Sequence, residues 1–132
     1  MQAERARQFV RQNHRGVLAT LRKDGRPQVT PVMAGVDEGG RVEISSSELT
    51  AKVRNLRRDP RASLCMLTES FFGESTQILG TAEIVSLPEA MDGLVEYYRR
   101  IAGEHPDWGE YREAMKREQR CLIKITIEQA IP

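Results

Sequence analysis

The stretch Gly16–Val36, GVLATLRKDGRPQVTPVMAGV, contains two apolar segments of strand length on either side of a tight turn. Asp24-Gly25 is the turn signal, because glycine supplies the positive φ that a tight hairpin needs. The pattern therefore predicts one strand over Gly16–Leu21 and a second over Pro27–Val36. Pro31 interrupts the second strand and cannot donate to a sheet ladder. We therefore expect an edge, a bulge or a ligand along that strand's flank.

Outward from this hairpin, the hydrophobic pattern predicts four further strands and four helices. The expected strands are Arg41–Ser45 (alternating, as a half-exposed strand does), Ala62–Thr68, Thr76–Leu87 with a bulge at Gly80, and Arg120–Ala130. The expected helices are Ala3–Asn13, about Glu48–Arg58, one that opens at a capping box formed by Ser86 and Glu89, and Trp108–Arg117. This order predicts a mainly β (α+β) fold, a small β-barrel with flanking helices, rather than a parallel α/β sheet.

The composition is that of one ordinary globular domain. The 132 residues, 39% apolar and 30% charged, predict a single domain over residues 1–132. A formal net charge of +1 argues against a general nucleic-acid binder, and no apolar run is long enough to span a membrane. The N-terminus lacks the apolar core of a secretory signal, and Cys65 and Cys121 stand alone in strand-like runs. We therefore expect two reduced core thiols and a cytoplasmic protein.

The segment SSSELTAKVRNLRRDP, Ser45–Pro60, is the sharpest candidate site. Backbone N–H groups at a helix N-terminus attract anions, and the neighbouring hydroxyls and Lys52 would add to that attraction. An inward stripe that begins at Leu49 would leave Lys52 on the helix flank, with Asn55 beside it. The pattern predicts a phosphate-bearing cofactor here. The alternative is an ordinary serine-capped helix whose arginines form a solvated face.

Polar residues on the second strand are the next candidates. Gln28 and Thr30 alternate to the same face, so both could contact one ligand. A flavin-like ring needs backbone donors and acceptors for its pyrimidine edge, and a strand broken by Pro31 leaves such groups unpaired. The alternative is an edge strand with polar outer side chains.

No nucleophile, phosphate-loop or dinucleotide motif is present in the sequence, so we assign no catalytic side chain. His14 and His105 lack the spacing of metal ligands, and no metal site is expected. Trp108 is interpreted as packing of the helical pair rather than as part of a pocket. The function therefore depends on which cofactor the chain binds.

Several of these segments together resemble the pyridoxamine-phosphate-oxidase-like split β-barrel family of flavin-binding proteins. The resembling residues are Gly16–Leu21, Asp24–Gln28, Ala51–Ala62 and Gly80–Ala82, in an order that spans nearly the whole chain. Tyr98–His105, followed by Asp107 and Trp108, also resembles the actinobacterial branch that binds the deazaflavin coenzyme F-420.

The resemblance implies a homodimer with two cofactor sites at the subunit interface, each holding coenzyme F-420 (8-hydroxy-5-deazaflavin) or, alternatively, FMN. The second strand would lie along the ring, Lys52 and the serines would hold the phosphate, and Gln77 would approach from the partner subunit. The expected cofactor-binding residues are Gln28, Thr30, Pro31, Val32, Ser45, Ser46, Thr50, Ala51, Lys52, Asn55 and Gln77.

The activity implied by the resemblance is hydride transfer from C5 of the reduced cofactor to a small electron-poor acceptor, an enone, a quinone or a tetrapyrrole-like molecule. Pyridoxamine phosphate oxidation is not expected, because this chain stops at Pro132, before the arginine-rich substrate segment of those oxidases. Three alternatives stay open: an FMN-dependent oxidoreductase of the same fold, a non-catalytic carrier of a cofactor or planar ligand, and a structural dimer or nucleic-acid accessory with an arginine surface patch. The patch would comprise Arg54, Arg57, Arg58 and Arg61.

Overall fold

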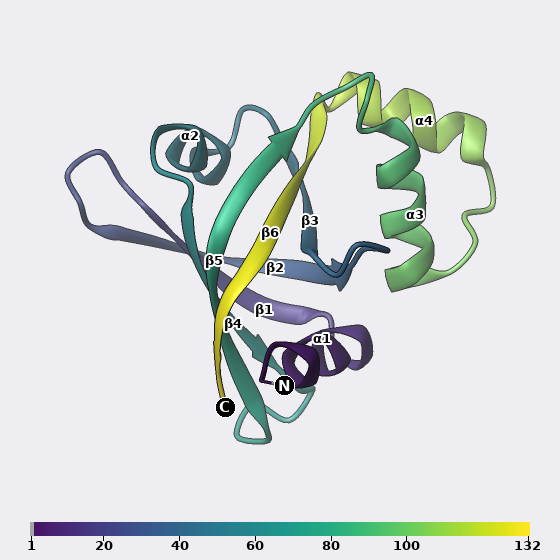
Figure 1. Ribbon diagram of the computed structural model, residues 1–132. Helices are drawn as coiled ribbons and strands as arrows, with labels where there is room; N and C mark the ends of the chain where they lie inside the picture. Colours follow the sequence, from purple (N-terminus) through teal and green to yellow (C-terminus); the bar gives the residue numbers. More distant parts are fainter. Residues whose placement is uncertain (1) are drawn as a thin grey trace.

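The computed structural model describes residues 2–132 and contains a closed antiparallel barrel of six strands (Figure 1). Around the barrel the strands follow the order β1-β2-β3-β6-β5-β4, and β4 pairs with β1 to close it. The strands are β1 Arg15–Leu21, β2 Pro27–Val36, β3 Val42–Ser47, β4 Arg61–Leu67, β5 Ser75–Val85 and β6 Arg120–Ile131. The mainly β barrel with flanking helices that the sequence predicted is confirmed.

The β1–β2 hairpin forms as predicted, with Gly25 at φ 87° in its turn. Strand β2 occupies the predicted bounds, but its two flanks differ. It pairs with β1 from Pro27 to Met33, whereas it pairs with β3 only through Ala34–Val36. Residues 27–33 therefore leave one flank of β2 unpaired. Pro31 was expected to mark an edge, a bulge or a bound ligand, and the structure shows an edge. The barrel is split between β2 and β3 along this length.

Alternate residues of each strand point into the barrel and fill it with apolar side chains. Leu18, Ile44, Leu64, Ile78 and Ile123 are almost completely buried there. The predicted bulge is present, since the pairing of β5 with β6 shifts between Leu79 and Gly80. A Cβ atom on Gly80 would lie 2.1 Å from the carbonyl oxygen of Thr126, so only glycine fits this close approach of two strands.

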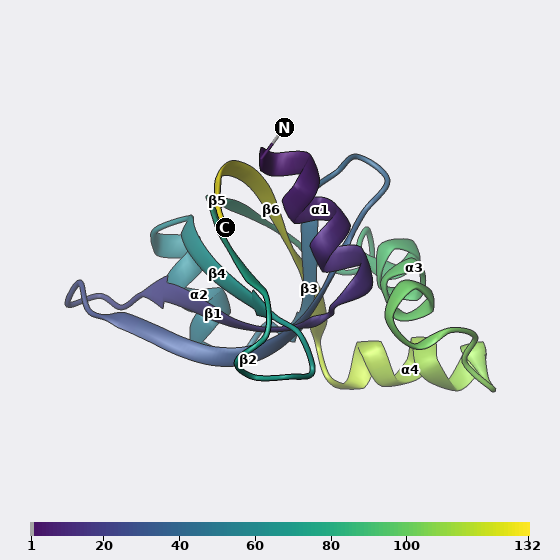
Figure 2. The ribbon, with the colours of Figure 1, turned by 90° about the horizontal axis from the view of Figure 1, so that it is seen from below.

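Four helices surround the barrel, and Figures 1 and 2 show α3 and α4 together on the side away from α2. Helix α1, Gln2–Gln12, lies against β2, β5 and β6, and α2, Ala51–Arg58, lies against β1 and β5. Helices α3, Met91–Ala102, and α4, Trp108–Arg117, form a second apolar cluster with Leu122 on the outer side of β6. None of the helices within residues 2–132 is both long enough and apolar enough to cross a membrane.

Two predicted helix starts are wrong. Helix α2 begins at Ala51 rather than near Glu48. The backbone N–H of Glu48 donates instead to the Gln119 carbonyl, and the backbone N–H of Leu49 donates to the Ser47 hydroxyl. Leu49 is therefore 66% exposed and not part of an inward stripe. The capping box is absent as well. The Ser86 hydroxyl donates to Glu48, and α3 begins later, at Met91.

Two expectations about burial are also wrong. Cys65 lies exposed on the outer side of β4, so only Cys121 is a buried thiol; both are free. Strand β3 is not half-exposed, since Glu43 is completely buried. Strict alternation places Glu43 on the outer side of the barrel, but helix α3 covers that side.

Candidate functional site

The open flank of β2 exposes unpaired backbone groups at the split. The Ala34 N–H donates to the His14 carbonyl, just before β1, at 2.7 Å. The backbone groups of Ala34 therefore point toward β1, and along β2 this direction alternates from residue to residue. By that alternation, the backbone groups of Val29, Pro31 and Met33 point away from β1 toward the open side. The Met33 carbonyl accepts a hydrogen bond from the Tyr97 hydroxyl of α3 at 2.6 Å. Burial raises the pKa of Tyr97, so its hydroxyl is a neutral donor at neutral pH.

A polar network joins β2 to helix α2 at the same split. The Asn55 amide nitrogen donates to Gln28 Oε1 at 2.8 Å and to Thr20 Oγ1 at 3.1 Å. Asn55 is buried, so its two bonds orient the Gln28 side chain at the mouth of the split. Thr30 and Val32 lie on the same face of β2 as Gln28, and all three are half-buried.

A cavity of about 370 Å³ lies beside this network and is strongly cationic. It brings together three of the predicted site residues, Gln28, Ala51 and Asn55. Its other lining residues are Arg22, Lys23, Arg54 and Arg58. The cavity therefore has four cationic side chains and no carboxylate in its wall. Arg22 and Lys23 were not among the sequence candidates, because nothing local shows that the hairpin tip faces α2.

The start of α2 lacks a side-chain cap. Thr50 occupies the N-cap position, but its hydroxyl donates to the Ser47 carbonyl at 3.0 Å and lies 2.9 Å from the Ser46 hydroxyl. The N–H groups of the first helical turn are consequently free of a capping oxygen. Ser46 and Thr50, both predicted, are thus brought together at the helix start.

Two half-buried cations lie next to this helix start. Burial lowers the pKa of Lys52, and the positive charge of Arg120 lowers it further. Within residues 2–132, no carboxylate is near enough to offset either effect on Lys52. The Arg120 Nε donates to the Ser45 hydroxyl at 3.2 Å, and its nearest carboxylate, that of Glu118, is 3.9 Å away. Two adjacent cations with weak or absent counter-charges favour an anion between or beside them.

Arg120 was missed by the sequence analysis. Arg120 comes just before the alternating apolar residues of β6, and its local sequence is that of an ordinary strand end. Its place beside Ser45 follows from the pairing of β3 with β6, where Arg120 lies opposite Ser47. Pairing between strands 73 residues apart leaves no local signal in the sequence.

Two predicted residues lie on the outer face of the barrel, away from the α2 side of the split. Pro31 is exposed on the outer face of β2, opposite Val17. Gln77 is exposed on the same outer face, where a row of directly paired residues runs Pro31, Val17, Cys65, Gln77 across four strands. Gln77 thus points away from Gln28 and Asn55 of its own subunit. Among residues 2–132 no group of three His, Cys, Asp or Glu side chains is arranged to hold a metal ion.

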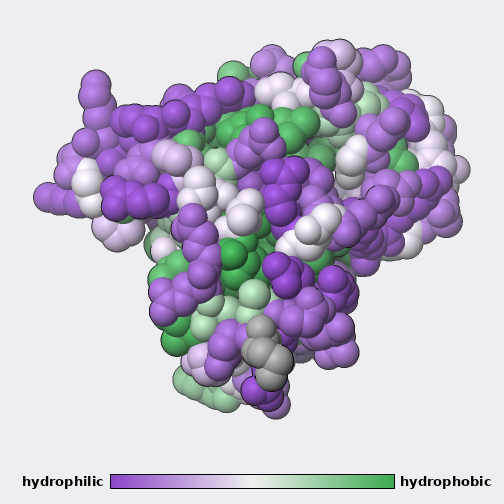
Figure 3. Space-filling model, in the orientation of Figure 1, coloured by the Kyte–Doolittle hydropathy of each residue, from purple (hydrophilic) through white to green (hydrophobic). Residues whose placement is uncertain are grey.

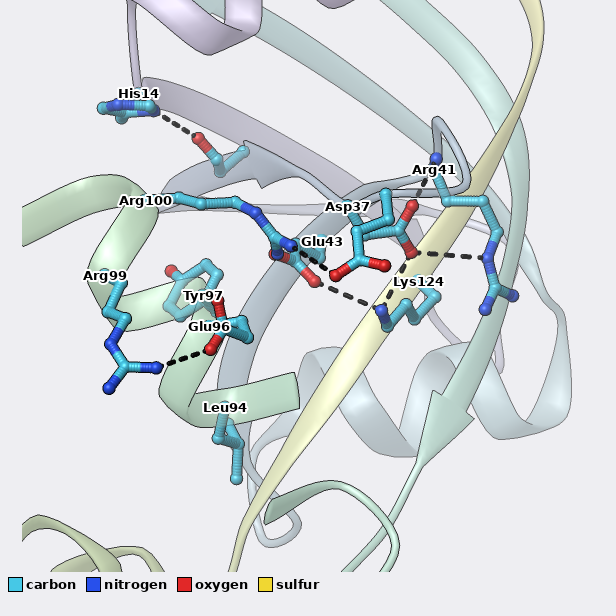
Figure 4. Close-up of polar contacts among 12 residues, drawn as sticks. His14, Asp37, Arg41, Glu43, Leu94, Glu96, Tyr97, Arg99, Arg100 and Lys124 are labelled. Carbon is cyan, nitrogen blue, oxygen red and sulfur yellow. Dashed lines mark hydrogen bonds and ion pairs between the residues drawn. The ribbon is translucent and has the colours of Figure 1, made fainter. Parts of the chain in front are cut away.

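A buried ion cluster, also missed, fixes α3 against the barrel (Figure 4). The Glu43 carboxylate accepts from Arg100 of α3 at 2.6 Å and lies 3.2 Å from the Lys124 amine of β6. Lys124 also donates to Asp37 at 2.8 Å. Burial acts to raise the pKa of Asp37, but the bonds from Lys124 and from the Arg41 N–H lower it overall. The cluster positions α3, and with it Tyr97, over the split.

Comparison with known proteins agrees with this architecture. The sequence matches the family model described as pyridoxamine 5'-phosphate oxidase over residues 3–131. A conserved hypothetical protein from Mycobacterium tuberculosis is 27% identical, with a TM-score of 0.80 over 98% of this chain and 82% of that one. An F420 reductase is 19% identical, with a TM-score of 0.73 over 94% of each chain.

A heme binding protein from Mycobacterium smegmatis is 23% identical, with a TM-score of 0.73. The match covers 98% of this chain and 52% of that one, so this chain spans about half of that protein. The last two likenesses concern the fold, and the family match covers almost every residue. The chain is therefore a member of the pyridoxamine 5'-phosphate oxidase family of split β-barrels, as its sequence motifs predicted.

Proposed function

We propose that this protein is a cytoplasmic, homodimeric oxidoreductase that binds coenzyme F-420 and reduces a small electron-poor acceptor. One observation carries the proposal: Lys52 and Arg120 lie together, half-buried and poorly neutralised, beside the uncapped first turn of α2. This is a donor set for a phosphate, which would accept from backbone N–H groups, a lysine and an arginine at once.

The ring of the cofactor would lie along the open flank of β2. The N–H groups of Val29 and Met33 and the carbonyls of Val29 and Pro31 offer donors and acceptors there. A pyrimidine edge requires such alternating groups. Gln28, held by Asn55, supplies a side-chain amide at the same place.

The cationic cavity favours a deazaflavin over FMN. Arg22, Lys23, Arg54 and Arg58 extend the positive surface beyond the helix start. FMN ends at its phosphate, whereas coenzyme F-420 continues from its phosphodiester into a chain of carboxylates. A ligand with further anionic groups would use this cavity, and FMN would leave it empty. The runner-up is therefore an FMN-dependent oxidoreductase with the same phosphate site.

The chemistry would come from the cofactor. Reduced deazaflavin supplies a hydride from C5, so the acceptor gains two electrons and completes its reduction with a proton from solvent, while the cofactor is oxidised. The chain's own residues would bind and orient the ring and hold the phosphate. Tyr97, neutral and bonded to the Met33 carbonyl, would border the ring at the Met33 end of the open flank.

The outer face of the barrel supports the homodimer. Val29 is 65% and Met33 45% exposed, and they continue into Val17, Ala19 and Cys65. Exposed apolar side chains gathered on one sheet face are typical of an interaction surface. This face ends at the open flank of β2, so a second subunit would border the cofactor site.

The first experiment is a fluorescence titration of the purified protein with coenzyme F-420, with FMN, and with the deazaflavin nucleoside that lacks the phosphate. We expect F-420 to bind tightest, and Lys52→Ala and Arg120→Ala each to weaken it about 10- to 100-fold through loss of a charged hydrogen bond. The matched control is Lys116→Ala, an exposed lysine on α4 paired with Glu113. Equal binding of the nucleoside and F-420, or no effect of Lys52→Ala, would contradict the assignment. Preference for FMN would favour the runner-up, and binding without oxidation of the reduced cofactor by any acceptor would indicate a carrier.

A further inference from the structure

A second cavity, of about 570 Å³, lies between the segment that leads into α3 and one face of α4. Its lining residues are Leu87, Pro88, Met91, Gly109, Arg112, Glu113 and Lys116. It is larger than the cationic cavity beside α2, and the two cavities share no lining residue. Apolar surface shows between hydrophilic side chains at the upper right of Figure 3, the region where Figure 1 places α3 and α4. A concave cavity of this size, with an apolar wall and a few charged groups, is typical of a small-molecule site.

The walls of this cavity are held by the packing beneath them. Leu94, Tyr111 and Leu122 form the buried part of the second apolar cluster, and Leu87 and Met91 pack against that cluster while they stay half-buried. The Tyr111 hydroxyl donates to the Leu94 carbonyl at 2.9 Å, which joins α4 to α3. The cavity is therefore formed before any ligand arrives.

Gly109 leaves room in the α4 wall. A Cβ atom at this position would have one neighbour within 4 Å outside its own helix backbone, Asp107 Oδ1 at 3.4 Å. Gly109 lies inside α4 and has no positive φ. Glycine weakens a helix relative to alanine. Neither the backbone conformation nor the packing of the subunit therefore requires glycine here, whereas a larger side chain would take up space in the cavity.

The charges around the cavity leave one cation available to a ligand. The Lys116 amine lies 3.1 Å from the Glu113 carboxylate on the same helix, so these two charges neutralise each other. Within residues 2–132, Arg112 has one ion pair, with Asp92 at 3.8 Å, and the Asp92 side chain is 97% exposed. A long, exposed pair of this kind is weak. The Arg112 guanidinium can therefore donate to a ligand's carboxylate without the loss of a strong contact.

We propose that this cavity binds a small carboxylic acid with an apolar body. The apolar body lies against Leu87, Pro88 and Met91, and the carboxylate accepts from Arg112. Burial of apolar surface supplies most of the affinity, and the arginine selects an anionic head group over a neutral or cationic one. No residue of β2 or α2 lines the cavity, so this site is additional to the proposed cofactor site and does not depend on it.

The test uses three probes with the same apolar body and different head groups: 4-phenylbutyrate, 4-phenylbutan-1-ol and 4-phenylbutylammonium. Isothermal titration calorimetry of the purified protein measures the affinity of each. We expect the carboxylate to bind about tenfold tighter than the alcohol, through one charged hydrogen bond, and the ammonium to bind weakest. Equal affinities of the three probes, or no binding of the carboxylate, would overturn the inference.

Two variants test whether the ligand lies in this cavity. Arg112→Ala should lower the affinity for 4-phenylbutyrate about tenfold and leave that for the alcohol within about twofold, so that the preference for the anion is lost. Gly109→Leu should fill the cavity and lower the affinity for both probes at least about tenfold. Its melting temperature should stay at the wild-type value or rise, because a helical glycine is replaced. The matched control is Arg117→Ala, an exposed arginine of the same helix paired with Glu110, which should bind as the wild type does.

The remaining outcomes separate this site from the other surfaces of the protein. Unchanged binding in Gly109→Leu would place the carboxylate elsewhere and overturn the inference. Loss of 4-phenylbutyrate binding in Lys52→Ala would place it at the proposed phosphate site, with the same consequence. A change of oligomeric state in Gly109→Leu, measured by analytical ultracentrifugation, would make the cavity an interface between copies of the chain, against the inference. Failure of F-420 to bind would refute the proposed function and leave this site standing.

Discussion

Removal of the Glu43 carboxylate should destabilise the protein strongly. Glu43 is completely buried and lies 2.6 Å from Arg100 and 3.2 Å from Lys124. Loss of one partner of a buried ion pair typically costs about 3–5 kcal/mol, because the remaining charge stays buried. Here each cation keeps another carboxylate. Lys124 remains 2.8 Å from Asp37, and Arg100, which is 27% exposed, remains 3.8 Å from Glu38.

We therefore expect Glu43→Ala to cost about 3 kcal/mol, the lower end of that range. At the average unfolding entropy of globular proteins this is a fall in melting temperature of about 10 °C. Urea unfolding at neutral pH, followed by circular dichroism, measures the free energy directly. The control is Glu96→Ala, which removes an exposed partner of Arg99 and should cost less than about 0.5 kcal/mol. A cost below about 1 kcal/mol for Glu43→Ala would refute the view that this cluster holds α3 to the barrel.

Three further perturbations follow from the same geometry. Gly80→Ala should cost about 3 kcal/mol in urea unfolding, because its Cβ would lie 2.1 Å from the Thr126 carbonyl; a cost near zero would show that the bulge can relax. Asp37 has a lowered pKa in the folded protein, so its contribution to stability is complete above its ordinary pKa near 3.8 and is lost as pH falls through the lower folded value. Asp37→Asn should flatten the acid limb of a stability–pH curve, and an unchanged limb would contradict this. Lys52 has a lowered pKa, so F-420 affinity should begin to fall at a lower alkaline pH than for an ordinary lysine. Lys52→Arg should remove that fall, as a titration across alkaline pH would show.

The strands and the regular helices were predictable because local patterns determine them. Strand β2 and helix α4 have the bounds that the sequence predicted, since Asp24-Gly25 and Asp107 mark their starts with turn and cap chemistry. The capping box at Ser86 failed because its hydroxyl found a distant partner, Glu48. Local hydrogen bonds compete with tertiary ones, and a single sequence does not show which will form.

The structure brings several of the predicted site residues together, but their neighbours from other strands could not be predicted. Lys52, Asn55 and Gln28 belong to two segments, on α2 and β2, whose motifs could be recognised. Arg120 and Glu43 depend on which strand or helix lies beside them, and alternation alone assigned Glu43 to solvent. A buried charged residue in a strand has the same sequence pattern as an exposed one, because burial is decided by the covering helix.

The two prolines of β2 have a consequence for how the split barrel avoids unwanted association. An open strand flank is a template onto which a strand of another molecule can add. Among the four residues whose backbone faces that flank, Pro27 and Pro31 have no N–H, so only Val29 and Met33 can donate. A foreign strand would find every second N–H donor of this flank missing, whereas a small planar ligand needs only one or two of these groups. The edge thus discriminates against polymerisation while it stays accessible to a ring.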